Sequence, residues 1–282
     1  MSRVAVVGAG TMGNGIAHVF AQHGWDTTLI DVAPGLLERV LALIRTNFER
    51  QVKKGTVTAE QRDAALARIR TSTSLDAVAD AELVVEAATE QSDVKFKIFR
   101  DLDRLAPPAA ILASNTSSIS ITTIAAQTKR PPQVVGMHFM NPVPVMSLVE
   151  VIRGLETGEE TVGKVVEVVK VLNKTPVVVN DAPGFVSNRV LMPMINEAVL
   201  CVMEGVATPE AVDTVMTLGM NHPLGPLALA DLIGLDVCLA ILEVLQRDLG
   251  DDKYRAAPLL RTMVAAGRLG RKSGRGFYVY RD

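Results

Sequence analysis

The chain has 282 residues, of which 48% are apolar, and its formal charge at pH 7 is −2. This length allows one large domain or two smaller ones, and we expect two. The nearly balanced charge argues against nucleic acid or a polybasic membrane anchor as a partner, so we expect small molecules and further copies of the chain.

The cysteines and the start of the chain indicate the cellular setting. Cys201 and Cys238 both lie within apolar stretches, which argues against a disulfide scaffold and against a cysteine metal site. A strand pattern begins almost directly after Met1, and no run of about 18 apolar residues suggests a membrane span. We therefore expect a soluble cytoplasmic protein without a metal.

The opening segment carries the pattern of a dinucleotide-binding unit. Residues 4–7 form a short apolar run, which is typical of a parallel strand covered on both faces. The next residues, Gly8-Ala9-Gly10-Thr11-Met12-Gly13, fit the motif G-x-G-x-x-G. Its glycines permit a tight turn, the close approach of a pyrophosphate and close packing of the following helix. A helical apolar stripe then leads to Gly24, which suits a helix C-terminus.

Asp31 indicates which dinucleotide binds. It ends the strand pattern of residues 27–30 and lies 21 residues after Gly10. A carboxylate at this place accepts hydrogen bonds from both ribose hydroxyls of NAD, whereas it repels the 2′-phosphate of NADP. The three residues after Asp31 include no arginine that would reverse this choice. Strand, glycines, helix and acid in this order predict NAD as the cofactor.

The middle of the chain extends this unit. Residues 36–70 show helical spacing interrupted near Gly55, which predicts a helical pair. Its basic residues Arg50, Lys53 and Lys54 either meet an anionic substrate tail or form a solvated helix face, and the sequence favours neither. Further strands are predicted at residues 83–85, 111–113, 134–137, 148–152 and 176–179. With the helical segments between several of them, they predict a doubly wound Rossmann-type sheet with a helical-pair insertion over residues 1–182.

From Pro183 onward the strand pattern nearly vanishes. The apolar residues now recur at helical spacing, so we expect residues 183–282 to form an all-α domain. Thr208-Pro209-Glu210 predicts a helix start, with a capping hydroxyl and proline in the first turn. Residues 227–245 predict one long apolar helix, which lines a dimer interface or is an ordinary core helix.

Position separates His138 from the other three histidines. His18 and His23 lie on the first predicted helix. His222 lies in a loop beside Pro223, and we interpret all three as structural. His138 ends a predicted strand and opens a turn-rich stretch, at the edge where a doubly wound sheet binds its ligands. A dehydrogenase of alcohols needs a base for the hydroxyl proton, and His138 is the best candidate.

Glu150 is the candidate partner of His138. It lies in the apolar run of residues 148–152, where an unpaired carboxylate would be unfavourable. A chain reversal at Pro142 and Pro144 would bring it to His138, where it would fix the tautomer of the imidazole and stabilise its charged form. The alternative is a surface glutamate on an edge strand.

Asn115-Thr116-Ser117-Ser118 follows the strand predicted at residues 111–113. Its hydroxyl groups should therefore also reach the carboxyl edge of the sheet. On residue chemistry alone, helix capping is the favoured role for this segment. The residues thus indicate a nicotinamide enzyme with a histidine–glutamate pair, and they leave the substrate open.

A series of segments along nearly the whole chain resembles the L-3-hydroxyacyl-CoA dehydrogenase family, most closely its bacterial 3-hydroxybutyryl-CoA dehydrogenases. The segments are Gly8 to Gly13, Ala113 to Ser118, His138 to Pro144, Gly184 to Arg189, Asn221 to Asp236 and Arg271 to Tyr278. Such an ordered series is far more specific than any single motif. The resemblance implies reversible oxidation of (S)-3-hydroxyacyl-CoA, with 3-hydroxybutyryl-CoA as the expected substrate, to 3-ketoacyl-CoA by NAD in fatty-acid or butanoate metabolism.

The resemblance also implies roles for individual residues. It makes His138 the base and Glu150 its orienting partner, and it places Ser117 and Asn188 around the reacting oxygen of the substrate. It implies cofactor contacts from Gly8, Ala9, Gly10, Thr11, Met12, Gly13, Asp31, Glu90, Lys95, Ser117, Asn141 and Lys272. Lys53 and Lys54 are expected to meet the CoA nucleotide. A homodimer formed through the helical domain, which also serves the substrate, is implied as well.

Two other functions stay open. One is a dehydrogenase of free hydroxy acids or sugar acids on the same architecture, because a fold does not determine its substrate. The other is a non-enzymatic dinucleotide-binding protein that has kept the fold. The presence of Ser117, His138, Glu150 and Asn188 argues against the second.

Overall fold

The structure, a computed structural model, describes residues 3–280. The chain divides into two compact units, unit 1 from Met1 to Ala182 and unit 2 from Pro183 to Asp282. Each unit buries a hydrophobic core of its own. Within the described residues, no helix is long and apolar enough to cross a membrane, and no group of histidine, cysteine and acidic side chains is arranged to hold a metal ion.

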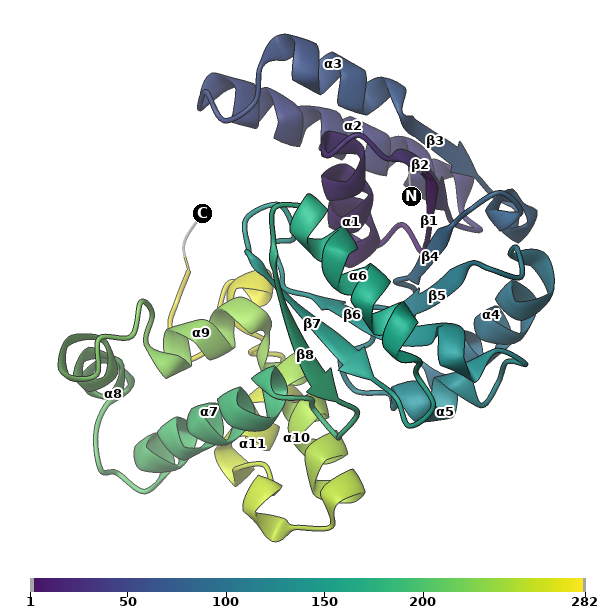
Figure 1. Ribbon diagram of the computed structural model, residues 1–282. Coiled ribbons are helices and arrows are strands. Elements are labelled where there is room, and N and C mark those ends of the chain that lie inside the picture. Colours follow the sequence, from purple (N-terminus) through teal and green to yellow (C-terminus); the bar gives the residue numbers. More distant parts are fainter. Residues whose placement is uncertain (1–2, 281–282) are drawn as a thin grey trace. The chain divides into compact units, whose positions relative to one another are not determined.

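Unit 1 is built on an eight-stranded sheet (Figure 1). The strands are β1 (Arg3–Val7), β2 (Asp26–Ile30), β3 (Ile69–Ser72), β4 (Leu83–Glu86), β5 (Ile111–Ser114), β6 (Val134–Phe139), β7 (Leu148–Arg153) and β8 (Thr175–Asn180). They lie in the order β3-β2-β1-β4-β5-β6-β7-β8, parallel except for the antiparallel pair β6 and β7. The strand order reverses between β1 and β4, which is where a doubly wound sheet binds its ligand. The predicted doubly wound architecture is confirmed.

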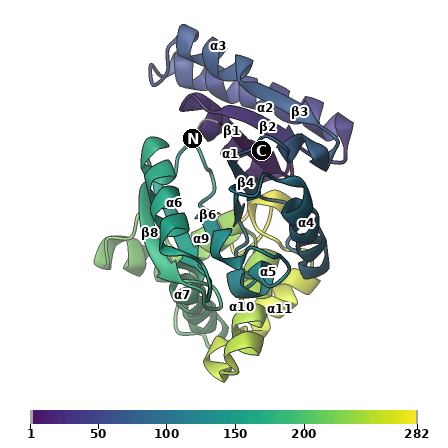
Figure 2. The same cartoon turned by 45° about the vertical axis from the view of Figure 1, so that its right-hand side comes forward.

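Helices cover both faces of this sheet. They are α1 (Thr11–Gln22), α2 (Pro34–Lys53), α3 (Ala59–Ala67), α4 (Ser92–Leu105), α5 (Ile121–Ala125) and α6 (Glu159–Val171), with short 3-10 turns η1 (Leu75–Val78) and η2 (Pro131–Gln133). The apolar side chains of α1 and α6 share one core with β1 and β4. Figure 2 shows α4 and α5 on the side of the sheet opposite α6.

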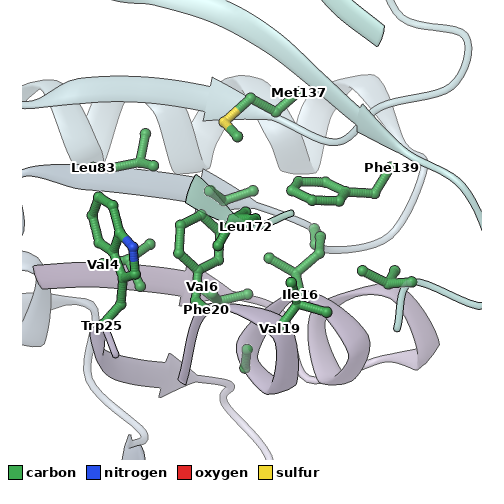
Figure 3. Packing of buried hydrophobic residues seen from close by; sticks show 14 of the residues in the cluster. Val4, Val6, Ile16, Val19, Phe20, Trp25, Leu83, Met137, Phe139 and Leu172 are labelled. Carbon is green, nitrogen blue, oxygen red and sulfur yellow. The ribbon is translucent and has the colours of Figure 1, made fainter. Parts of the chain in front are cut away.

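Aromatic packing fixes α1 against β1. Val4 and Val6 face this core because alternate side chains of a strand point to the same face. Figure 3 shows Phe20 of α1 beside Val6, with Trp25 near Val4. The rings of Phe20 and Trp25 meet edge to face, with 5.2 Å between their centroids. Burial of each such side chain contributes about 1.5–3 kcal/mol to the stability of the fold. This packing holds β1 and α1, and therefore the glycine turn between them, in a fixed position.

The predicted helical pair corresponds to α2 and α3, but its predicted end at Arg70 is wrong. Helix α3 ends at Ala67, and β3 begins at Ile69. Residues Ile69 to Ser72 form a parallel ladder with β2, so hydrogen bonding to a neighbouring strand overrides the local helical pattern. The start of α3 follows the rules of helix capping, because the side chains of Thr58 and Gln61 each accept a hydrogen bond from the other's backbone.

Unit 2 is helical, as predicted. Its helices are α7 (Ser187–Met203), α8 (Pro209–Thr214), α9 (Pro226–Ile233), α10 (Leu235–Leu249) and α11 (Pro258–Ala265), with short helical turns η3 (Val215–Gly219), η4 (Asp252–Tyr254) and η5 (Arg271–Ser273). Thr208 caps α8 through its hydroxyl, as expected. The single helix predicted over residues 227–245 is wrong. Gly234 has a φ of +107°, a conformation that side chains rarely adopt, and it divides the stretch into α9 and α10.

Buried Asp231 of α9 holds residues 276–280 against this helix. Its two carboxylate oxygens accept hydrogen bonds from the backbone N–H groups of Phe277 and Tyr278, each over 3.0 Å. The hydroxyl of Tyr280 donates to the same carboxylate over 3.1 Å. A Cβ atom at Gly276 would lie only 1.9 Å from Asp231 Oδ1, so this approach requires glycine. The buried carboxylate thereby has hydrogen-bond donors for both of its oxygens.

Candidate active site

The glycine turn between β1 and α1 leaves room for a ligand. Gly8 has a φ of +102°, and a Cβ there would lie 2.6 Å from the carbonyl oxygen of Ala87. A Cβ at Gly13 would lie 1.8 Å from the Gly8 oxygen, whereas one at Gly10 would meet nothing within 4 Å. No side chain caps the N-terminus of α1. The first amides of the helix therefore fit a pyrophosphate that approaches along Gly10.

Asp31 follows β2 and faces this turn. Its Oδ2 accepts a hydrogen bond from Ala9 N over 2.8 Å, and its Oδ1 accepts one from Ala33 N over 3.0 Å. A carboxylate has about four acceptor positions, so these two bonds orient Asp31 and leave capacity for ribose hydroxyls. The residues of this end of the sheet fit NAD.

A buried ionic cluster lies beyond β4. Glu86, the last residue of β4, is fully buried, and Lys95 on α4 is 1% exposed. Lys95 Nζ donates to Glu86 Oε1 over 2.7 Å and to Oε2 over 2.9 Å. It also lies 3.3 Å from Glu90 Oε2. The direct partners of Lys95 are thus carboxylates, and through them it positions the loop that carries Glu90.

Glu90 organises the segment that follows β5. Its Oε1 accepts hydrogen bonds from Thr116 Oγ1 over 2.6 Å, from Ser117 N over 2.8 Å and from Ser118 N over 3.0 Å. Ser117 Oγ donates to the same oxygen over 3.2 Å. Burial alone would raise the pKa of Glu90, but the ammonium of Lys95 and these hydrogen bonds outweigh it and hold the pKa below its ordinary value. Glu90 is therefore a carboxylate that fixes the place of Ser117.

Helix capping was the favoured role for residues 115–118, but another residue caps α5. Ser120, not a residue of the segment 115–118, caps α5, since its hydroxyl accepts from Thr123 N. Asn115 instead uses its side-chain oxygen to accept a hydrogen bond from Phe139 N over 2.9 Å. That bond joins the end of β5 to the end of β6, one residue after His138.

His138 and Glu150 meet as expected from their positions in the sequence. They lie opposite each other in the antiparallel ladder of β6 and β7, because the chain reverses between these strands. His138 Nδ1 and Glu150 Oε2 are 2.8 Å apart, and both side chains are buried. The alternative of a surface glutamate on an edge strand is wrong. A proton on Nδ1 that is donated to the carboxylate makes Nε2 the acceptor nitrogen of the neutral imidazole.

The other predicted site residues lie in the turn after β6, at the end of α2 and in unit 2. Asn141 lies in the turn after β6, and Lys53 and Lys54 lie exposed at the end of α2. In unit 2, Asn188 lies in the first turn of α7. Lys272 lies in η5, where its Nζ donates to Asp236 over 2.7 Å.

The three remaining histidines have structural surroundings. His18 is fully buried on α1 and stacks on Phe48, with 4.0 Å between the ring centroids. Burial lowers the pKa of His18 to about 4. His23 is the C-cap of α1 and contacts Val19 O through its ring over 2.9 Å. His222 lies in the loop before α9.

Sequence reasoning missed Glu86. Besides Lys95, its carboxylate accepts hydrogen bonds from Ala88 N and Ser114 Oγ, each over 2.7 Å. A signal was present, because Glu86 directly follows the apolar run of residues 83–85. An acid directly after a parallel strand is the same pattern that drew attention to Asp31.

Comparison with known proteins gives a consistent result over the whole chain. Residues 3–182 match the family profile of the 3-hydroxyacyl-CoA dehydrogenase NAD binding domain, and residues 184–280 match that of the 3-hydroxyacyl-CoA dehydrogenase C-terminal domain. A probable 3-hydroxybutyryl-CoA dehydrogenase of Deinococcus radiodurans is 56% identical over 278 residues, which are 99% of this chain and 100% of the relative.

A second relative and a solved structure are also 3-hydroxybutyryl-CoA dehydrogenases. The 3-hydroxybutyryl-CoA dehydrogenase of Bradyrhizobium diazoefficiens is 52% identical and is matched over 100% of this chain and 96% of its own length. The crystal structure of (S)-3-hydroxybutyryl-CoA dehydrogenase from Ralstonia eutropha superposes with a TM-score of 0.97 at 51% identity, covering 100% of both chains.

Proposed function

Because the chain belongs to the 3-hydroxyacyl-CoA dehydrogenase family, we propose that it interconverts (S)-3-hydroxybutyryl-CoA and acetoacetyl-CoA with NAD, in fatty-acid or butanoate metabolism. The observation that carries this proposal is the buried contact of 2.8 Å between His138 and Glu150, at the edge of a sheet whose glycine turn fits NAD. A cytoplasmic location belongs to the same proposal.

In the proposed mechanism, His138 moves the proton. NAD, when bound, supplies the acceptor of the hydride that leaves C3. His138 Nε2 takes the proton of the C3 hydroxyl during oxidation and returns it to the oxygen during reduction. Glu150 keeps the ring in the required tautomer and stabilises the imidazolium. Ser117 and Asn188 hold the reacting oxygen, so that the proton and the hydride leave from a fixed geometry.

The substrate is tested by a comparison of NADH oxidation rates. We expect oxidation of NADH with acetoacetyl-CoA and a much lower rate with free acetoacetate, because a CoA-dependent enzyme uses binding energy from the remote nucleotide. A higher rate with the free acid would indicate a dehydrogenase of hydroxy acids. Measurable NADH binding without oxidation by any short 3-ketoacyl-CoA would indicate a binding protein.

Exposed apolar residues of unit 2 support a homodimer. Val215, Leu218 and Met220 are close in sequence and are 60%, 82% and 62% exposed in the single chain. Large apolar side chains gathered on a surface commonly mark an interface. We expect a dimer in sedimentation velocity and a shift toward monomer in Leu218→Lys. The matched control is Leu155→Lys in unit 1, where Leu155 is 83% exposed. Equal behaviour of the two variants would exclude this surface.

A further inference from the structure

The ionic cluster beyond β4 carries an excess of negative charge. It consists of two carboxylates, Glu86 and Glu90, and one ammonium, Lys95. The other groups in contact with Glu86, Ala88 N and Ser114 Oγ, are hydrogen-bond donors, so its oxygens act as acceptors. Glu90 is likewise surrounded by donors, and its pKa is held low. The cluster therefore has a net charge of −1.

The fold places this charge on the nicotinamide side of the dinucleotide site. The strand order reverses between β1 and β4, and a dinucleotide lies across that point. Asp31, at the end of β2, is on the adenosine side. The other half of the dinucleotide therefore extends toward the carboxyl ends of β4 and β5, where Glu86 ends its strand and Ser117 follows.

Glu86 is linked to the glycine turn through the peptide between Ala87 and Ala88. Ala88 N donates to Glu86 Oε1 over 2.7 Å. The peptide between Ala87 and Ala88 lies so close to Gly8 that a Cβ on Gly8 would be 2.7 Å from Ala88 N. The charge of Glu86 is thus held rigidly beside the turn, in a place without solvent. Such a charge is screened by salt much less than a surface charge.

We propose that the net negative charge of the cluster of Glu86, Lys95 and Glu90 favours the cationic nicotinamide ring of NAD⁺ over the neutral ring of NADH, and that the buried carboxylate of Glu86 supplies this charge. The inference rests on the proposed function, since it requires the nicotinamide cofactor. Its physical basis is that oxidised and reduced cofactor differ by one positive charge on the ring. An acidic cluster distinguishes the two forms, whereas hydrogen bonds to the ribose and the pyrophosphate do not.

The test is a charge series read as the ratio of two dissociation constants, that of NAD⁺ divided by that of NADH. NADH binding is followed by its fluorescence and NAD⁺ binding by competition. Glu86→Gln changes the net charge of the cluster from −1 to 0 and keeps one acceptor oxygen, which can take the place of Oε1 that accepts from Lys95 and Ala88 N. The double variant Glu86→Gln/Lys95→Met returns the net charge to −1.

We expect Glu86→Gln to raise the ratio about tenfold, the scale of one unit charge acting over roughly 10 Å at an effective dielectric constant of about 20. The double variant should bring the ratio back toward that of the wild type, even if both forms bind more weakly. Glu167→Gln on α6 is the matched control, because its side chain is 70% exposed and its charge is screened. It should leave the ratio unchanged.

An unchanged ratio in Glu86→Gln overturns the inference, and so does a raised ratio that the double variant fails to restore. If thermal unfolding shows that Glu86→Gln does not fold, Glu90→Gln makes the same charge change at a side chain that is 37% exposed, and Glu90→Gln/Lys95→Met returns the net charge to −1. The same two outcomes then apply to this pair of variants. Failure of the wild-type chain to bind NADH would instead contradict the proposed function. The two failures are therefore distinguishable.

Discussion

The hydrogen bond between His138 and Glu150 links two properties that a catalytic base needs. It fixes which ring nitrogen accepts a proton, and it places a carboxylate where the imidazolium needs compensation. Both side chains lie on neighbouring strands in a fixed antiparallel register, so neither depends on a mobile loop for its position. Removal of either group should affect the chemical step far more than the binding of the cofactor.

We expect His138→Ala to lower kcat by about 10²–10⁴-fold, the usual contribution of a positioned general base. Glu150→Gln should also lower kcat strongly, because it removes the charge that stabilises the imidazolium. Initial rates of NADH oxidation with acetoacetyl-CoA give kcat, and NADH fluorescence gives the dissociation constant, which should stay close to that of the wild type. Near-normal turnover of His138→Ala would remove the histidine from the mechanism.

Asp31 makes a separate prediction about the choice of cofactor. Asp31→Asn removes the charge that attracts ribose hydroxyls and repels a 2′-phosphate, so NAD should bind about ten- to a hundredfold more weakly and NADP should lose less. Dissociation constants for both cofactors measure this. Asp26→Asn, at the exposed start of β2, is the control. Equal weakening for NAD and NADP would show that Asp31 does not contact the ribose.

Residues that act through a local pattern could be predicted, and residues that act through contacts distant in sequence could not. The glycine motif and Asp31 follow one another within a single strand–helix–strand unit. His138 and Glu150 could be paired because only a short turn separates their strands. Glu86 follows a predicted strand, as Asp31 does, but the contacts that give it importance are with Lys95 on α4 and Ser114 on β5, which the sequence does not place beside it.

At the scale of elements, the contact between α1 and α2 buries an ionisable group. His18 of α1 stacks on Phe48 of α2, and its Nε2 contacts Gln51 Oε1 over 3.3 Å. Its Nδ1 has no hydrogen-bond partner among the described residues. Burial is the largest cause of the lowered pKa of about 4, so this contact accommodates the neutral ring and disfavours the charged one.

The stability of the chain should therefore fall in acid through His18. In the unfolded chain the imidazole takes up a proton near its ordinary pKa of 6.5, whereas in the folded chain it does so near pH 4. The contribution of the neutral His18 ring to the free energy of unfolding is fully present above pH 6.5. As the pH falls toward 4, this free energy declines by about 1.4 kcal/mol per pH unit and by about 3 kcal/mol in all. Urea unfolding between these pH values measures the slope.

The control for this slope is a variant without the group. His18→Gln should have a shallower dependence of unfolding free energy on pH in this range, whatever its stability at neutral pH. Parallel curves for His18→Gln and the wild type would show that His18 does not contribute.

The errors in predicted elements have one physical origin. Local periodicity assigns residues 69–70 to a helix and residues 227–245 to one continuous helix. Residues 69–70 pair with β2 and therefore form a strand. Gly234 interrupts residues 227–245 because its φ of +107° does not belong to a helix. Strands that consist of a short apolar run were predicted well, because a strand buried on both faces is apolar at successive positions.

At the scale of the whole molecule, the predicted cofactor residues are distributed unequally between the units. Most belong to unit 1, whereas Lys272 belongs to unit 2. Its ammonium pairs with Asp236 at the start of α10, and the side chains of this pair are 46% and 39% exposed. An exposed pair of this kind adds little to stability. Lys272 therefore offers a way to ask whether unit 2 takes part in cofactor binding without disturbing the fold.

We expect Lys272→Met to weaken NADH binding severalfold, because a cation near a dinucleotide favours its phosphates, and to leave the thermal unfolding midpoint nearly unchanged. NADH fluorescence titration and thermal unfolding measure the two effects. Arg268→Met removes one positive charge from the same basic region and serves as the control for a general charge effect. If both variants weaken NADH equally, the region acts only through its overall charge. If Lys272→Met binds NADH as the wild type does, Lys272 belongs to a solvated basic tail, and the binding energy of the cofactor comes from unit 1.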